Sequence, residues 1–142
     1  MGLLTHVAEI EYHYGNIDVN EMREILVNAL QSTKNFEIQE SVKGMFERRG
    51  HKHSVSHVHM IKNDPLDESK VLYAICTSPL LRFKDDVAFS INVVAENNVI
   101  VKGLSVSRLG EGDFFKNKKN LDIIMRKVQI KFKLNKTTII RS

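Results

Sequence analysis

Four histidines in the middle of the chain have a spacing that suits transition-metal binding. His51, His53, His57 and His59 all have odd numbers, so a continuous strand would project their imidazoles to one side. Two imidazoles on one strand can bind one Zn²⁺, Ni²⁺ or Cu²⁺ ion, although a closed tetrahedral site needs ligands from elsewhere. The simpler interpretation is a solvent-facing histidine stripe, which we favour. We therefore predict no cofactor, with a divalent transition metal at these histidines as the alternative.

A carboxylate and a guanidinium are placed to form an ion pair across a hairpin. Asp85 shares the parity of the odd-numbered apolar residues after it, and Arg108 that of the even-numbered apolar residues before it. A four-residue turn pairs Val94 with Val99 and places Asp85 opposite Arg108, whereas a two-residue turn at 97–98 moves them one step apart. We predict a structural Asp85–Arg108 ion pair at the open end of the sheet.

The residues around this pair form the candidate ligand site. Asp86, Arg108, Gly110, Asp113 and Asn117 could line a polar cleft at the mouth of the hairpin. Glycine next to a helix start permits positive φ, and free helix N–H groups there can bind an anion. The alternative for Asp113 or Asn117 is a capping role at the following helix.

The sequence gives little support for catalysis. It contains no nucleophile elbow, phosphate-binding loop, His-Glu-x-x-His motif or paired cysteines. The lone Cys76 lies in an apolar segment, where a thiol is typically an inert core residue. Asp85 and Asp86 are adjacent in a strand and point to opposite faces, so they cannot act as an acid/base pair. We therefore expect a non-enzymatic binding or interaction module for an unknown small ligand or protein partner.

Two motifs in this region resemble the signature of a family of domains of unknown function, DUF1499. The first reads Phe-x-Asp-Asp-x-x-Phe at 83–89, and the second reads Ser-Arg-x-Gly-x-x-Asp-x-x-x-Asn at 107–117. The resemblance covers about residues 19–128 and is specific from Ser78 onward. It implies the family's fold but no established activity.

Composition and charge describe a small domain with a basic end. The chain has 142 residues, of which 42% are hydrophobic, and a net charge of +4. This favours one soluble domain over 1–142. Segment 116–142 holds nine basic residues and one acid, while the remainder has 12 basic and 16 acidic residues. This asymmetry is consistent with an anionic surface or nucleic acid as partner, or with a solvated helix and a lysine-protected strand.

We see no secretory signal or membrane span and expect an intracellular, cytoplasmic protein.

The elements that must position these residues alternate between strand and helix patterns. Strands are expected at 7–14, from 36 to as far as 46, and at 54–62, 71–77, 85–94 and 99–107, with asparagines in the turn between the last two. A helix begins after the capping box Asp18–Glu21, and a second runs through Leu121–Val128. Segment 131–141 alternates and is expected to be an edge strand. This order predicts an α+β fold, a single antiparallel sheet with two helices packed on one face.

Overall fold

The computed structural model describes residues 7–39, 71–78, 83–107 and 114–141, which form five strands and two helices. These elements are β1 (Val7–Gly15), α1 (Val19–Gln31), β2 (Phe36–Ile38), β3 (Val71–Thr77), β4 (Lys84–Ala95), β5 (Asn98–Ser107) and α4 (Phe114–Arg141). The strand expected at 54–62, with its histidines, lies outside the described residues. Among the described residues, the strand that begins at Phe36 ends at Ile38.

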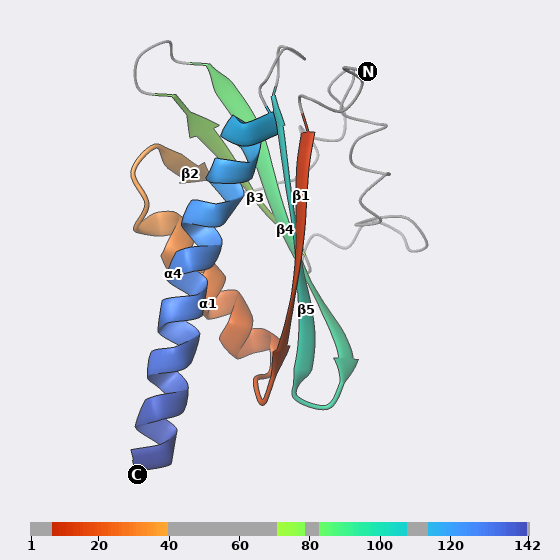
Figure 1. Cartoon of the computed structure of the whole chain (residues 1–142), viewed down its shortest axis with the longest axis vertical. Coiled ribbons are helices and arrows are strands. Elements are labelled where there is room, and N and C mark those ends of the chain that lie inside the picture. Colours follow the sequence, from red (N-terminus) through yellow and green to blue (C-terminus); the bar gives the residue numbers. More distant parts are fainter. Residues whose placement is uncertain (1–6, 40–70, 79–82, 108–113, 142) are drawn as a thin grey trace.

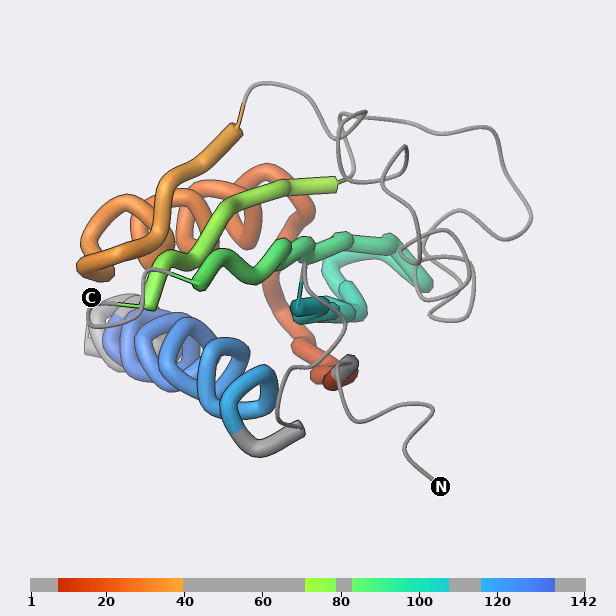
Figure 2. The backbone as a smooth tube through the Cα atoms, turned by 90° about the horizontal axis from the view of Figure 1, so that it is seen from above, coloured from red at the N-terminus to blue at the C-terminus, as the bar shows by residue number. Residues whose placement is uncertain are grey.

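The strands form one antiparallel sheet in the order β1-β5-β4-β3-β2. The helices α1 and α4 contact each other and share one hydrophobic core on the same face of this sheet (Figure 1). Figure 2 shows the same arrangement from above, with α4 running beside the strands. The predicted α+β fold, one antiparallel sheet with two helices on one face, is therefore confirmed.

The helix-covered face of the sheet holds most of the apolar core. Its strand residues follow the alternation of the pleat and include Leu72, Ala74, Val87, Phe89, Ile91, Val99 and Val101. The helices contribute Met22, Ile25, Leu26, Ala29 and Leu30 from α1, and Leu121, Ile124, Met125 and Val128 from α4. Helical spacing on each helix thus produces one apolar stripe that packs on the sheet.

Gly103 allows close packing within this core. It pairs with Phe89 on one side and with Ile10 on the other. A Cβ atom at Gly103 would lie 2.9 Å from the Phe89 ring and 2.8 Å from the Ile10 side chain. Both distances are too short for real carbon contacts, so the close approach of the Phe89 and Ile10 side chains to β5 requires glycine at this position.

The opposite face of the central strands is also buried. Tyr73, Ala88, Ser90, Leu104 and Val106 each expose at most 5% of their surface. The central strands therefore read as nearly continuous apolar runs instead of alternating patterns. In such a strand, parity alone does not indicate which residues face the helices.

The hairpin of β4 and β5 contains a bulge that the sequence did not reveal. Val93 pairs with Val99, and the pairing then shifts by one residue, so that Val94 is the extra residue of the bulge. The turn consists of Glu96 and Asn97. Asn97 has a φ of 59°, which confirms the expected use of asparagine where a hairpin needs positive φ.

The bulge changes the register at the other end of the hairpin. Asp85 lies opposite Ser107, so the predicted pairing of Asp85 with position 108 is wrong. The prediction assumed that the even-numbered apolar residues of β5 face the helices, but Val99 and Val101 do so instead. Arg108 itself lies outside the described residues.

The capping box of α1 is confirmed. Asp18 is the N-cap residue, and its carboxylate accepts a hydrogen bond from the Glu21 backbone N–H at 2.8 Å. At the other end, Lys127 of α4 donates to the Ser32 carbonyl at 3.0 Å. A cation near the last carbonyl groups complements the helix dipole and ties α4 to α1.

The C-terminal segment is helical, so the edge strand predicted at 131–141 is wrong. The alternating pattern in this segment covers only a few residues, whereas the apolar residues at helical spacing extend over a longer stretch and continue into it. These residues lie on one face of α4 and are Leu121, Met125, Val128 and Phe132. Phe132 packs edge-on against Tyr14 of β1, with ring centroids 4.9 Å apart.

Neither described helix is long and apolar enough to cross a membrane.

Candidate functional site

Polar side chains replace the apolar core at the end of the sheet where β4 begins, β5 ends and α4 begins. We call this the polar cluster; it consists of Asp85, Ser105, Ser107, Lys116, Asn117 and Asn120. The three strand residues lie on the helix-covered face, because Asp85 pairs with Ser107 and the pleat brings Ser105 to the same side. The three helix residues belong to the first two turns of α4 and reach down to them.

Asn117 joins α4 to β5 through both atoms of its amide. Its side chain is fully buried; it accepts a hydrogen bond from the Ser105 hydroxyl at 2.6 Å and donates to the Ser107 hydroxyl at 3.0 Å. The alternatives weighed from the sequence were a ligand contact and a helix cap. The structure shows that this buried amide joins the start of α4 to the sheet. Asn117 lies inside α4 and not at its cap, and its role as a ligand contact stays a prediction.

Asp85 is a buried carboxylate held from α4. It is 1% exposed, and its Oδ2 atom lies 3.0 Å from the Lys116 ammonium and 2.9 Å from the Asn120 amide nitrogen. The Asn120 amide also donates to the Ser105 hydroxyl at 3.2 Å. The Oδ1 atom of Asp85 is buried and accepts no hydrogen bond from the described part of the chain. One oxygen of this carboxylate is thus neutralised, and the other has no donor among the described residues.

Lys116 forms the outer edge of the polar cluster. Its side chain is 34% exposed, and its ammonium lies 5.9 Å from the centre of the Phe83 ring, a cation–π contact. Phe83 is itself 45% exposed, and its backbone N–H donates to the Ser78 hydroxyl at 2.9 Å. The cluster therefore meets solvent at a lysine and an aromatic ring.

Cys76 borders the cluster from β3, opposite Asp85. Its thiol donates a weak hydrogen bond to the Asn120 amide oxygen over 3.7 Å. Burial raises the pKa of Cys76 to about 11, and the negative charge of Asp85 acts in the same direction while Lys116 opposes it. The thiol is protonated at neutral pH, in agreement with the inert role expected from its apolar strand.

Asp86 faces away from the polar cluster. It is fully buried on the opposite face of the sheet, where its carboxylate accepts a hydrogen bond from the Tyr73 hydroxyl. The structure therefore does not bring Asp86 together with Asn117, since the sheet separates them.

The other predicted site residues fall outside the described part of the chain. These are Arg108, Gly110 and Asp113, which lie in the six-residue connection between Ser107 and Phe114, and the four histidines. Within the described ranges, no group of three or more His, Cys, Asp or Glu side chains is arranged to hold a metal ion. Metal binding by the four histidines thus stays a prediction from the sequence.

Sequence reasoning missed four members of the cluster as site residues, namely Ser105, Ser107, Lys116 and Asn120. A signal for Asn120 was present, because it shares a helical face with Asn117 and the apolar residue Leu121. A polar residue inside the apolar stripe of a helix needs a buried partner, and Asp85 is the charged residue at the facing strand end. Identifying Lys116 as a partner of Asp85 required the pairing register of β4 and β5, which the bulge at Val94 alters.

The fold and the cluster define a class of small α+β domain in which a buried polar network joins the last helix to the end of an antiparallel sheet. The chain belongs to the family described as "Protein of unknown function (DUF1499)", whose model matches residues 6–128. That span contains both motifs recognised in the sequence, and its start lies before the expected one. Among curated proteins, none matches the chain.

Proposed function

We propose that this chain is a binding module without catalytic activity, whose ligand site is the polar cluster at the end of the sheet. The observation that carries the proposal is the Oδ1 atom of Asp85, a buried carboxylate oxygen to which no described residue donates a hydrogen bond. Leaving a buried acceptor unsatisfied costs about 1–3 kcal/mol, so a ligand that supplies the donor gains that energy on binding.

Access to this oxygen leads through Lys116. Asp85 is almost fully buried, whereas the lysine that covers its other oxygen is one-third exposed. A lysine side chain has four rotatable bonds and can shift without disturbing the helix that carries it. Its ammonium has further N–H donors beyond the one used by Asp85, and these can bind an acceptor on the ligand.

The two groups together select the chemistry of the ligand. Asp85 takes a small hydrogen-bond donor, an ammonium or a hydroxyl, and Lys116 takes a neighbouring anionic oxygen. An α-amino acid or an α-hydroxy acid has both groups on adjacent carbon atoms. The predicted ligand residues Arg108, Gly110 and Asp113 lie in the connection between Ser107 and α4, so they are close in sequence to both sides of the cluster.

A titration followed by ¹H–¹⁵N NMR tests this proposal. Glycine and glycolate are the smallest probes with both groups, while methylammonium and acetate each carry one. We expect saturable shifts with glycine or glycolate at the amides of Asp85, Ser107 and Lys116, and weaker binding of the single-group probes. If neither two-group probe gives saturable shifts at these amides, the proposal is wrong.

A pair of variants separates this site from general charge effects. Asp85→Asn keeps the size of the side chain but removes the charge, and should weaken binding of the two-group probe at least about tenfold. The matched control is Asp122→Asn, which removes a carboxylate from α4, where it pairs with Lys118 at 2.9 Å. Equal effects of the two substitutions would contradict binding at the polar cluster.

A second candidate function is docking to an anionic lipid surface through α4. The helical C-terminal segment exposes Ile130 and Leu134, one turn apart, beside the exposed lysines Lys131 and Lys133. Apolar residues flanked by cations on one helix are typical of interfacial helices. The fraction of protein that co-sediments with vesicles should increase with their anionic lipid content. At equal salt concentration, the protein should bind these vesicles more strongly than it binds heparin. Stronger heparin retention would instead favour nucleic acid.

A further inference from the structure

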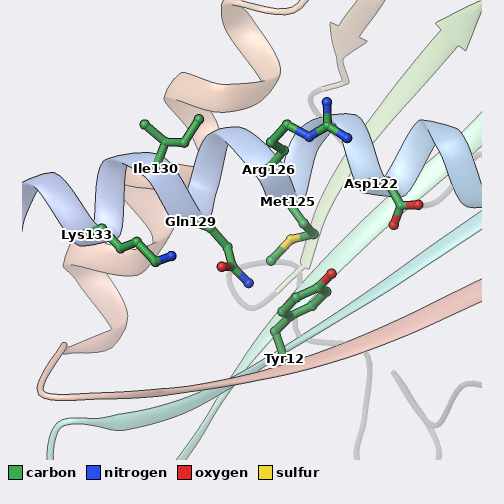
Figure 3. A pocket seen from close by; sticks show the side chains of 7 residues that line it. All are labelled: Tyr12, Asp122, Met125, Arg126, Gln129, Ile130 and Lys133. Carbon is green, nitrogen blue, oxygen red and sulfur yellow. The ribbon is translucent and has the colours of Figure 1, made fainter.

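A groove between β1 and α4, away from the polar cluster, has the features of a second ligand site. Its volume is about 370 Å³, within the range of sites for small molecules. Figure 3 shows Tyr12 of β1 projecting its ring toward α4, from which Met125 and Gln129 point back toward Tyr12. The groove is thus formed by a strand and a helix that the core holds in fixed positions.

The floor of this groove suits an aromatic ring. Tyr12 presents a ring and Met125 a thioether, two groups that make favourable contacts with aromatic ligands. Tyr12 is stacked on Tyr14, with ring centroids 6.4 Å apart and an interplanar angle of 16°. This stacking fixes the orientation of the Tyr12 ring before any ligand arrives, which lowers the entropy cost of binding.

The rim of the groove carries an excess of positive charge. The only acidic group among its lining residues, Asp122, is neutralised by Lys118 at 2.9 Å. Lys133 extends along the groove toward Gln129 in Figure 3, and Arg126 on the outer side of the helix makes no ion pair within the described part of the chain. An ammonium and an amide side by side can hold the two oxygens of a carboxylate.

We infer that the groove between β1 and α4 binds a small aromatic carboxylate. The ring of the ligand lies against Tyr12 and Met125, and its carboxylate contacts Lys133 and Gln129. This inference is independent of the proposed function, because the groove and the polar cluster share no residue.

Methyl NMR with [¹³C-methyl]-methionine protein tests the inference, since Met125 reports directly on the floor of the groove. The Met125 signal is assigned with Met125→Leu, a substitution that conserves volume. We expect benzoate to shift this signal saturably and its neutral analogue benzamide to bind at least about tenfold more weakly, as for loss of one charge-assisted hydrogen bond. Equal binding of the two, or no saturable shift with benzoate, would overturn the inference.

Two lysine variants locate the carboxylate. Lys133→Gln should weaken benzoate binding about tenfold, whereas Lys131→Gln, an equal charge change on the same helix outside the groove, should change it less than about twofold. Both side chains are exposed, so both variants should fold. Equal weakening by the two substitutions would show that only the general charge of α4 matters and would refute the site.

Discussion

The ion pair between Asp85 and Lys116 leads to the most quantitative prediction. Replacing Lys116 by Met leaves the Asp85 carboxylate buried, with Asn120 as its only described donor. Removing one partner of a fully buried pair costs about 3–5 kcal/mol. Lys116 is one-third exposed, so water can partly replace it, and we expect a loss below this range, about 2 kcal/mol.

Urea denaturation followed by far-UV circular dichroism measures this loss. For a domain of this size the slope is about 2 kcal/mol per molar urea, so the midpoint should fall by about 1 M. The matched control is Lys118→Met, which breaks a pair of similar length, 2.9 Å to Asp122, at the surface. Exposed pairs of this kind contribute about 0.2–1 kcal/mol, so the control should lower the midpoint by less than half as much.

A double-mutant cycle then isolates the pair itself. Asp85→Asn removes the buried charge, and in that background Lys116→Met should cost less than about 1 kcal/mol. The expected coupling energy between the two positions is about 1–2 kcal/mol, with the pair favourable. Additive effects, or a loss for Lys116→Met no larger than that for Lys118→Met, would refute the view that Lys116 neutralises a buried carboxylate.

Three further outcomes follow from the core. Gly103→Ala should lower stability by about 1–3 kcal/mol because its Cβ would collide with the Phe89 ring, while Gly15→Ala meets only the end of one side chain and serves as control; equal urea midpoints would contradict this. Burial raises the pKa of Cys76 from 9.0 to about 11 and that of Tyr14 from 10.0 to about 12, so the folded chain retains protons that the unfolded chain releases. Stability should be unaffected by these groups below pH 9 and should decrease as pH rises toward 12, and a constant urea midpoint from pH 8 to 11 would be inconsistent with these shifts. The same shift predicts that iodoacetamide modifies Cys76 at pH 8 about a hundredfold more slowly in the folded chain than in urea, whereas equal rates would mean an accessible thiolate.

The sequence predicted the elements that have strong local signals. The capping box at Asp18 and the asparagine turn at Asn97 depend on side chains within a few residues, and both are confirmed. The segment 131–141 failed because its alternation is short, and the packing of Phe132 on Tyr14 favours continuation of the helix. Local patterns in short segments are overridden by tertiary contacts of this kind.

The polar cluster lies at the end of the hairpin where the candidate site was predicted, but most of its residues differ from the predicted ones. A buried ion pair at the open end of the hairpin was expected, and Asp85 does carry one, with Lys116. The register could not be read from the sequence because both faces of β4 and β5 are buried and because Val94 forms a bulge. Asn117 was recognised by its position in the second motif, but its bonds to two serines depend on that register.

We propose that the Asp85 Oδ1 atom, which accepts no hydrogen bond from any described residue, marks a ligand site. A crystal structure grown with saturating glycine or glycolate tests it most directly. We predict that the ammonium or hydroxyl group of the probe lies within hydrogen-bond distance of Asp85 Oδ1 and that its carboxylate lies next to the Lys116 ammonium. A structure in which only water contacts that oxygen, with both probes present, would contradict the claim.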